Sequence, residues 1–243
     1  MLGQLVAGVP GGARMMDLDV LKQEAAGIAV DMVESGMLVG LGTGSTANHA
    51  IRGLGARFRD GLRFTGVPTS VASGELAGSF GIPLIRSPTA DAIDLTIDGA
   101  DEIGASDLSL IKGMGGALLW EKIVASMSRM VVIIADETKL APFLSGRVAV
   151  PVEVVRFGWE STAARLAGLG CRPALRRDGH GGPFRTDGDN VILDCAFDDL
   201  SDPAAVERAL SMTVGVVETG LFIGLATTIL VASADGVRRI DRV

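Results

Sequence analysis

Three carboxylates and a lysine stand where two apolar segments end, and together they could move protons. Asp98, Asp101 and Glu102, the acid cluster, follow one apolar run, and Lys112 follows another. Positioned carboxylates act as general acids and bases, and a lysine can stabilise negative charge that develops on an oxygen. An acidic surface turn with an isolated surface lysine would contain the same residues. The chemical interpretation therefore requires that these groups converge.

A glycine loop and another glutamate follow Lys112. The loop Gly113-Met114-Gly115-Gly116 precedes a segment with helical spacing, and Glu121 lies in the first turns of that segment. Alone, Glu121 would be explained by compensation of the helix dipole. A functional interpretation requires Glu121 and Lys112 to meet at the acid cluster. A metal site there ranks below direct acid–base work, because no histidine is near.

An earlier glycine loop has the features of an anion site. Gly42, Thr43, Gly44 and Ser45 lie between an apolar run and a helical pattern that begins at Thr46. Glycines let a ligand approach the backbone, and a helix start offers unpaired N–H groups and a positive dipole end. The threonine and serine hydroxyls add further donors.

This loop departs from the two common nucleotide-binding fingerprints. Ser45 stands where a dinucleotide motif needs its next glycine, and no acid follows the second strand to hold a ribose. A Walker loop would need Gly-Lys-Ser/Thr, which is absent from the sequence. A small phosphate monoester fits better than a nucleotide. A tight turn with a Ser/Thr helix cap remains the alternative and, for this loop alone, is slightly favoured.

The composition narrows the chemistry further. The 243 residues carry a formal net charge of -7, which argues against a general nucleic-acid surface. The two histidines, His49 and His180, are too few for a three-histidine zinc site, and there is no tyrosine to act as an acid. Cys171 and Cys195 indicate buried thiols in a reducing compartment, with a disulfide as the less favoured alternative. We expect no cofactor and no metal.

The chain shows no targeting or membrane signal. No uninterrupted apolar segment reaches the roughly 18 residues of a membrane span, so no membrane partner is expected. The first residues lack the basic start of a signal peptide. We expect residues 1–16 to be a disordered extension or a start-site artefact, and the protein to be cytoplasmic. An organelle is the alternative if residues 1–16 are a processed remnant.

Bringing these residues together requires strands whose ends meet at one edge of a sheet. The hydrophobic pattern predicts helices near residues 21–33, 46–58, 72–79 and 118–128, and strands at 37–41, 63–67, 82–85, 92–97 and 130–135. Such alternation implies an α/β fold, a mostly parallel sheet with helices on both faces. Ligands of open α/β sheets bind at the carboxyl ends of the strands.

The pattern changes after Pro151 and predicts a second unit. We expect strands at 152–155 and 190–194, helices at 161–169 and 202–210, and a polar turn region at 176–189. This combination indicates a small α+β lobe, and a last strand at 229–232 is expected to return to the first sheet. The predicted domains are residues 17–149 with 225–243 for the main domain, and 150–224 for the lobe.

Taken together, the motifs resemble the type A ribose-5-phosphate isomerase family. The matching stretches run in the family order from about residue 20 to the C-terminus, and they are VGLGTGSTA, TIDGADEI, LIKGMGGALLWEKIVA, IADETK, PVEVV, TDGDNVILD and VETGLF. The resemblance implies a Rossmann-like main domain, a ferredoxin-like α+β lobe, and a homodimer or homotetramer. It also implies metal-free interconversion of ribose 5-phosphate and ribulose 5-phosphate, a step of the non-oxidative pentose phosphate pathway, through an enediolate.

The resemblance also assigns roles to individual residues. Glu121 would be the base that moves a proton between C2 and C1, Asp98 and Asp101 would handle hydroxyl protons and ring opening, and Lys112 would stabilise the enediolate. The substrate-binding residues would be Lys22, Thr43, Gly44, Ser45, Thr46, Gly113, Gly115, Gly116 and Lys139. Three features depart from the family pattern: Met114 interrupts a glycine run, Trp120 replaces a common arginine, and segment 177–184 is longer than usual.

Two alternatives remain open at this stage. A related fold without catalytic acids could serve as a non-catalytic sensor of sugar phosphates, but Asp98, Asp101, Lys112 and Glu121 are all present here. An isomerase or deaminase acting on another sugar phosphate, such as a hexosamine phosphate, would use similar loops. Either alternative would keep a small sugar phosphate as the ligand.

Overall fold

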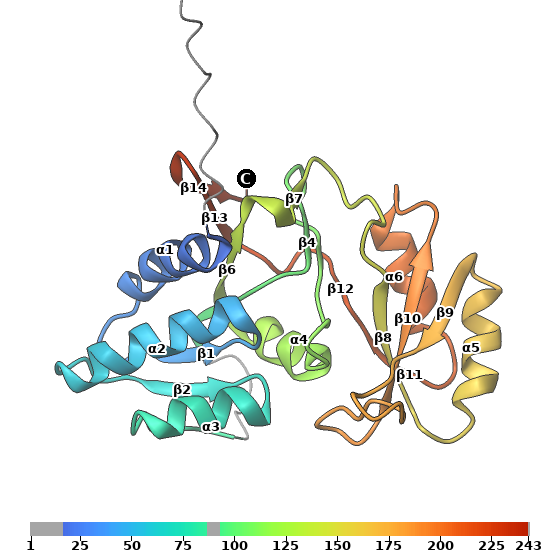
Figure 1. Cartoon of the computed structure of the whole chain (residues 1–243), viewed down its shortest axis with the longest axis horizontal. Helices are drawn as coiled ribbons and strands as arrows, with labels where there is room; N and C mark the ends of the chain where they lie inside the picture. Colours follow the sequence, from blue (N-terminus) through green and yellow to red (C-terminus); the bar gives the residue numbers. More distant parts are fainter. Residues whose placement is uncertain (1–16, 87–92, 243) are drawn as a thin grey trace, which may run out of the picture.

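The structure is a computed structural model that describes residues 17–86 and 93–242. The extension expected at residues 1–16 lies outside the described residues. In the described part, the strands form three sheets: a large one, a four-stranded antiparallel one and a small one made of two- and three-residue strands. The large sheet and the antiparallel sheet lie at opposite ends of the molecule, with the small strands between them (Figure 1).

The large sheet is mostly parallel, as predicted. Its strand order is β14-β13-β6-β3-β1-β2, and β14 runs antiparallel to β13 while the other neighbouring pairs are parallel. Its strands are β1 (Leu38–Leu41), β2 (Thr65–Pro68), β3 (Ile93–Asp98), β6 (Ser128–Asp136), β13 (Thr228–Ser233) and β14 (Gly236–Asp241). The predicted strand at 82–85 is wrong: only Leu84 forms an isolated bridge, to Gly66, because Pro83 in this short run offers no N–H for a ladder.

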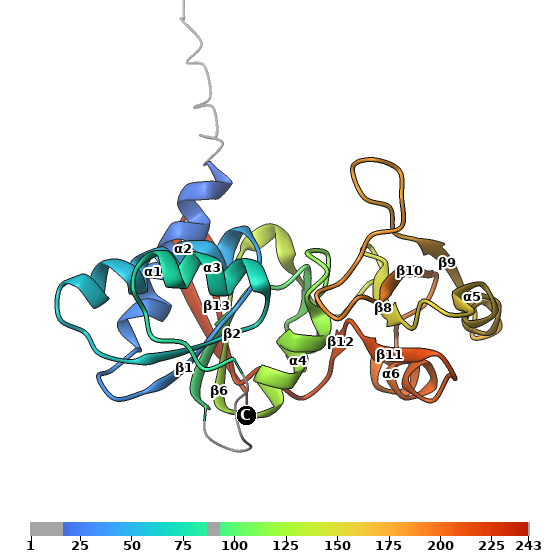
Figure 2. The ribbon, with the colours of Figure 1, turned by 90° about the horizontal axis from the view of Figure 1, so that it is seen from below.

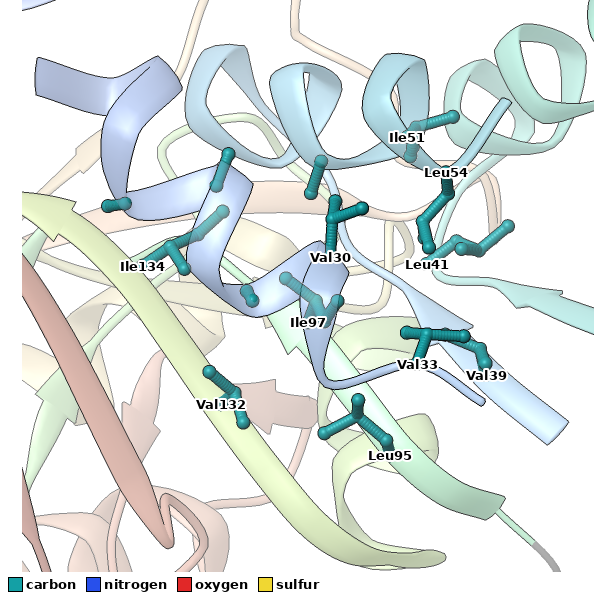
Figure 3. Close-up of a cluster of buried hydrophobic side chains, with 14 of the residues drawn as sticks. Val30, Val33, Val39, Leu41, Ile51, Leu54, Leu95, Ile97, Val132 and Ile134 are labelled. Carbon is teal, nitrogen blue, oxygen red and sulfur yellow. The ribbon is translucent and has the colours of Figure 1, made fainter. Parts of the chain in front are cut away.

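Helices cover both faces of this sheet, which confirms the predicted α/β architecture. They are α1 (Leu18–Asp31), α2 (Ser45–Arg59), α3 (Val71–Ser79) and α4 (Leu118–Ser126). Strand β6 shows the division, because Val132 and Ile134 pack with α1 and α2, whereas Val131 and Ile133 pack on the side of Ala125 in α4. Figure 3 shows the first of these layers, and Figure 2 shows α4 on the opposite side of the strands from α1, α2 and α3.

The register brings the ends of the parallel strands to one edge. Leu41 of β1 lies beside Pro68 of β2 and Ile97 of β3, so the segments that follow these three strands emerge together. Gly42 donates its N–H to the Ile97 carbonyl over 3.0 Å, which continues the pairing into the first glycine loop. The predicted meeting of strand ends is therefore present.

The antiparallel sheet belongs to the smaller lobe and has the ferredoxin-like topology expected. The elements are β8 (Val150–Val154), α5 (Trp159–Ala167), β9 (Cys171–Leu175), β10 (Val191–Phe197), α6 (Pro203–Ser211) and β11 (Val216–Thr219). Their strand order, β11-β8-β10-β9, is the order of a β-α-β-β-α-β unit. Leu166 of α5 and Leu210 of α6 pack into one core on the same face of this sheet.

Several short strands escape the sequence analysis. Strand β9 contains Pro173 and alternates only weakly, and β11 carries a register shift between Val216 and Glu218. The small sheet has the order β12-β5-β4-β7, from β12 (Leu221–Phe222), β5 (Leu110–Ile111), β4 (Glu102–Gly104) and β7 (Leu140–Ala141). Strands of two or three residues have no detectable period, so hydrophobic patterning cannot find them.

The two lobes are in direct contact at helix α4. Lys122 donates to a carboxylate oxygen of Glu218 in β11 over 2.7 Å and to the hydroxyl of Thr219 over 3.3 Å. The helix that carries Glu121 is therefore held by the smaller lobe as well as by the sheet.

The predicted domain limits, 17–149 with 225–243 and 150–224, remain a prediction. No helix within residues 17–86 and 93–242 is long and apolar enough to cross a membrane.

Gly40 allows β1, β3 and α4 to approach closely. A Cβ atom at Gly40 would lie 1.9 Å from the Thr96 hydroxyl oxygen and 2.8 Å from a methyl carbon of Val124. Neither neighbour can move freely, because Thr96 bonds to Ser128 within the sheet and Val124 is buried in α4. By contrast, Gly27 lies exposed in α1, and a Cβ there would meet nothing within 4 Å.

We expect Gly40→Ala and Gly27→Ala to change stability in opposite directions. Overpacking at Gly40 should lower the free energy of unfolding by about 1–3 kcal/mol. Alanine at the exposed helical position 27 should raise it by up to about 1 kcal/mol, because alanine loses less backbone entropy than glycine. Urea unfolding followed by circular dichroism measures both values. Equal effects of the two substitutions would contradict this account of Gly40.

Candidate active site

Lys112 brings two carboxylates from different elements together. Its ammonium lies 3.0 Å from a carboxylate oxygen of Asp98, at the end of β3, and 3.3 Å from Oε2 of Glu121, in α4. It also donates to the Gly99 carbonyl over 2.6 Å. The side chains of all three ionisable residues are at most 4% exposed. The convergence that the chemical interpretation required is therefore present.

The burial of these charges is tolerated because each is paired. An isolated charge in a protein interior is very unfavourable, whereas a hydrogen-bonded pair is not. Asp98 Oδ2 faces Lys112, and its Oδ1 accepts N–H bonds from Thr43 at 3.1 Å and Gly99 at 2.8 Å. Asp98 thus connects the buried ammonium to the first glycine loop.

Lys112 remains a cation in this environment. Burial alone would lower the pKa of its ammonium, but the negative charges of Asp98, Glu121 and Asp101 outweigh that effect and raise the pKa above its ordinary value. A fixed positive charge in a water-poor site stabilises an oxyanion far more than it would in water.

Glu121 has the properties of a proton acceptor that is not already engaged. Its Oε2 is buried and receives no hydrogen bond from any described group, although the Lys112 ammonium lies 3.3 Å away. Burial raises the pKa of Glu121 to about 8 against the opposing charge of Lys112, and the charge of Asp98 adds to the rise. A carboxylate with a raised pKa and an unused oxygen is suited to general acid–base catalysis near neutral pH.

Asp101 lies between the second glycine loop and two lysines. Its carboxylate accepts the N–H of Met114 over 2.9 Å, and its own N–H donates to the Ile111 carbonyl over 2.8 Å. Burial raises the pKa of Asp101, while the Met114 N–H and the charges of Lys112 and Lys139 oppose that rise. The carboxylate is therefore held in place but still faces a cavity.

The first glycine loop packs tightly against Asp98 and leaves a helix start open. A Cβ at Gly42 would lie 2.3 Å from the Asp98 carboxylate, so no larger residue fits. Gly44 has φ +106°, a conformation that favours glycine, and it precedes helix α2 with no side-chain cap on the helix. The first N–H groups of α2 therefore have no side-chain cap, and because Gly44, Ser45 and Thr46 line the cavity, this helix start is a candidate anion site.

Two further lysines complete the charge around the cavity. Lys22 of α1 donates to the Ser45 hydroxyl over 3.2 Å. Lys139 ends the short helix η1 (Glu137–Lys139), which Asp136 caps by accepting the Thr138 N–H over 3.0 Å. Lys22, Lys139 and Lys112 come from three separate elements, and all of them line the same cavity.

Eleven of the thirteen predicted site residues line this cavity. They are Lys22, Thr43, Gly44, Ser45, Thr46, Asp101, Lys112, Gly113, Gly115, Glu121 and Lys139, and they are joined by Gly99 and Ala100. Asp98 does not line the cavity, but its carboxylate contacts the Lys112 ammonium. Gly116 packs instead against Phe184 of the smaller lobe, where a Cβ would lie 2.4 Å from the ring. The side chain of Met114 is 58% exposed and does not line the cavity.

Sequence reasoning missed the residues that orient Thr43. The Thr43 hydroxyl lies 2.8 Å from the Thr69 hydroxyl and donates to that of Ser70 over 2.7 Å. Both partners follow β2, where the sequence analysis asked only whether an acid was present. Thr69 and Ser70 could have been predicted from the sequence, because polar residues at the end of a neighbouring parallel strand lie at the same edge of the sheet.

The described residues contain no cluster that could hold a metal ion. Among residues 17–86 and 93–242, no three or more His, Cys, Asp or Glu side chains have suitable positions. The ammonium of Lys112 forms ion pairs with two carboxylates, those of Asp98 and Glu121. Lysines and the start of α2 supply positive charge at this cavity.

Comparison with known proteins gives a consistent result. The profile of the family described as ribose 5-phosphate isomerase A (phosphoriboisomerase A) matches residues 65–236. Ribose-5-phosphate isomerase A from a Synechococcus strain is 51% identical over 224 residues, which cover 92% of this chain and 97% of that protein. The protein of that name from Thermomicrobium roseum is 48% identical and covers 93% and 96% of the two chains.

Solved structures agree in fold over nearly the whole length. Ribose 5-phosphate isomerase A from Methanocaldococcus jannaschii has a TM-score of 0.88 at 35% identity, covering 93% of this chain and 100% of that one. A D-ribose-5-phosphate isomerase in complex with phospho-erythronic acid has a TM-score of 0.89 at 36% identity, with the same coverage. The chain belongs to the ribose 5-phosphate isomerase A family, aldose–ketose isomerases that interconvert ribose 5-phosphate and ribulose 5-phosphate in the pentose phosphate pathway.

Proposed function

We propose that this chain isomerises ribose 5-phosphate through an enediolate, with Glu121 as the base and Lys112 as the stabilising cation. The observation that carries this assignment is Oε2 of Glu121, which is buried without a hydrogen bond 3.3 Å from the Lys112 ammonium, in a residue that lines the cationic cavity. A base and an oxyanion partner at this separation can serve adjacent atoms of one small substrate.

The phosphate binds at the first glycine loop in this proposal. The open start of α2, the Ser45 and Thr46 hydroxyls and the Lys22 ammonium offer donors to an anion at one end of the cavity. Binding the unreactive phosphate there orients the sugar, so that its reacting carbons extend toward Glu121. Because these donors are local, the overall charge of -7 does not prevent anion binding.

The proton transfer follows from this orientation. Glu121 takes the proton from C2 of the open-chain aldose, the C2–H electron pair forms the C1–C2 double bond, and O1 gains the negative charge. Lys112 stabilises that charge. A proton moves between O2 and O1, Glu121 returns its proton to C1, and O2 becomes the ketose carbonyl. The base recovers its starting state, so no cofactor is consumed.

The two aspartates have different roles in this mechanism. Both oxygens of Asp98 are engaged, by Lys112 on one side and by the Thr43 and Gly99 N–H groups on the other. We therefore assign Asp98 to holding the ammonium and the loop. Asp101 lines the cavity and uses one oxygen to accept the Met114 N–H, so it is the carboxylate that can handle hydroxyl protons and ring opening.

The complex of a related isomerase supports this placement of charge. Phospho-erythronic acid, the ligand in that complex, carries a phosphate and a carboxylate. An enediolate phosphate likewise carries two anionic groups. In this chain, the loop at α2 and the Lys112 ammonium are two cationic regions within one cavity, which matches that charge distribution.

We also infer that the protein assembles as a homodimer or homotetramer. Apolar side chains are exposed where β8 ends and β11 begins: Phe157 is 95% exposed, Met212 84% and Val214 75%. The Val155 N–H donates to the Gly215 carbonyl over 2.9 Å, so these side chains belong to neighbouring segments of the smaller lobe. Large apolar side chains that are exposed on neighbouring segments favour contact with another chain.

Replacing Glu121 with glutamine should lower kcat by about 10²–10⁴-fold, because the amide keeps the size of the side chain but cannot accept the C2 proton. Conversion of ribose 5-phosphate to ribulose 5-phosphate by the purified variant measures the effect. Glu160→Gln, at an exposed position in the first turn of α5, is the matched control and should leave kcat unchanged. Near-wild-type turnover by Glu121→Gln would rule out this base.

The pH profile should show an acid limb displaced upward. Glu121 must be deprotonated to act, so kcat/KM should fall as the pH decreases through its pKa. Because burial raises that pKa to about 8, the limb should lie well above the ordinary glutamate value of about 4.3. A substrate phosphate also titrates near pH 6, at about the value of other phosphate monoesters. The residual kcat/KM of Glu121→Gln should therefore still decrease through the phosphate pKa near 6, but it should no longer decrease through a pKa of about 8. A wild-type profile that stays flat down to pH 5 would contradict the assignment.

Removal of metal ions should leave kcat unchanged, since the Lys112 ammonium supplies the positive charge at the enediolate. The measurement is turnover of ribose 5-phosphate after dialysis against EDTA, with Mg²⁺, Mn²⁺ and Zn²⁺ added back separately. Loss of activity that one of these metals restores would instead make the carboxylates of this site metal ligands.

A further inference from the structure

A hairpin of the smaller lobe reaches the second glycine loop of the main domain. The hairpin, residues 176–189, joins β9 to β10 and was predicted only as a polar turn region. Its first residue, Arg176, directs its guanidinium at the backbone of the loop. Nη1 donates to the Gly113 carbonyl over 2.7 Å and to the Met114 carbonyl over 3.0 Å.

Arg176 is itself held in place. Its Nε donates to a carboxylate oxygen of Asp194 in β10 over 3.0 Å, and Nη2 pairs with the other oxygen of the same carboxylate. The Arg176 side chain is only 12% exposed. A bidentate arginine–carboxylate pair with little solvent access has a well-defined orientation. The remaining guanidinium nitrogen is therefore aimed at the loop by the rigid sheet of the smaller lobe.

The loop passes this constraint on to Asp101. The Met114 N–H donates to the Asp101 carboxylate over 2.9 Å, while the carbonyls of Gly113 and Met114 accept from Arg176. The peptide between Gly113 and Met114 thus has its carbonyl bonded to the smaller lobe and its N–H bonded to a cavity carboxylate. If this peptide moved, its N–H would move with it, and the Asp101 carboxylate that accepts that N–H would lose its present position.

Glycines make the loop dependent on outside contacts. Gly113 and Gly116 have φ of +104° and +83°, so the loop is built from residues with wide conformational freedom. Phe184 of the same hairpin packs where a Cβ of Gly116 would be, and Asp187 accepts the Val71 N–H over 2.8 Å at the start of α3. The hairpin therefore contacts the main domain at three places around the site.

We propose that Arg176, oriented by Asp194, is a positioning residue that sets the Asp101 carboxylate through the Gly113–Met114 peptide. The inference rests on the role proposed above for Asp101. It assigns the smaller lobe a part in the reaction, because the lobe supplies the contact that keeps a glycine-rich catalytic loop in one conformation. An arginine suits this task, since its planar fork can bind a carboxylate and a carbonyl pair at the same time.

Arg176→Met should lower kcat by about 10²-fold, the order expected when a catalytic group is displaced by about 1 Å. Arg176→Lys should lose less, because one ammonium can still reach the loop carbonyls. The matched control is Arg172→Met, in strand β9, which ends one residue before Arg176. Arg172 forms a bidentate pair with Asp198 but is largely exposed, so this variant should leave kcat unchanged. Urea unfolding of each variant verifies that it is folded.

A double-mutant cycle separates positioning from general structural support. If Arg176 acts through Asp101, Arg176→Met should cause little further loss of kcat in an Asp101→Asn background. Equal fold-losses in the two backgrounds, or wild-type kcat for Arg176→Met, would overturn the inference. Wild-type kcat for Asp101→Asn alone would instead show that the role proposed for Asp101 is wrong, and the inference would fail with it.

Discussion

The buried ammonium of Lys112 is the interaction on which the site depends. One cation satisfies Asp98, at the end of β3, approaches Glu121 in α4, and donates to the Gly99 carbonyl. Without it, two carboxylates would be buried near each other with no counter-charge, an arrangement that proteins avoid by protonation or rearrangement. The same cation is the group that can stabilise an enediolate. In the proposed mechanism, structural pairing and catalytic charge therefore come from a single side chain, and Oε2 of Glu121, which has no hydrogen bond, is the oxygen that accepts the proton.

Close backbone packing explains the glycines of β1 and of the first loop. Gly42 lies against the Asp98 carboxylate, and Gly40 lets Thr96 of β3 and Val124 of α4 approach β1 closely. Gly44 adopts a positive φ immediately before α2, which leaves the first N–H groups of that helix available to an anion. In both loops the backbone, rather than a long side chain, makes the contact. This arrangement explains how a protein with a formal charge of -7 can bind a phosphate through local donors.

The smaller lobe contacts two segments of the main domain that carry site residues. It holds α4 through the contact of Lys122 with Glu218, and it holds the second glycine loop through Arg176 and Phe184. Glu121 and the loop that carries Met114 are thus both fixed from the same side. A loop rich in glycine pays a large entropic cost on ordering. Contacts from a rigid antiparallel sheet offset that cost without filling the cavity with side chains.

The sequence by itself determined the class of fold, the motifs and most of the residues that line the cavity. Alternating apolar patterns predict the parallel sheet, because buried strands and amphipathic helices have different periods, and loops that follow parallel strands must meet at one edge. The short strands β4, β5, β7 and β12, which place Asp101 and Lys112, have no period to detect. Only the tertiary structure decided that Asp98 pairs with Lys112 while Asp101 lines the cavity, that Oε2 of Glu121 is buried without a hydrogen bond, and that Arg176 reaches the second loop. These results depend on distances between segments far apart in the chain and on the burial of charge, and neither quantity is encoded in local spacing.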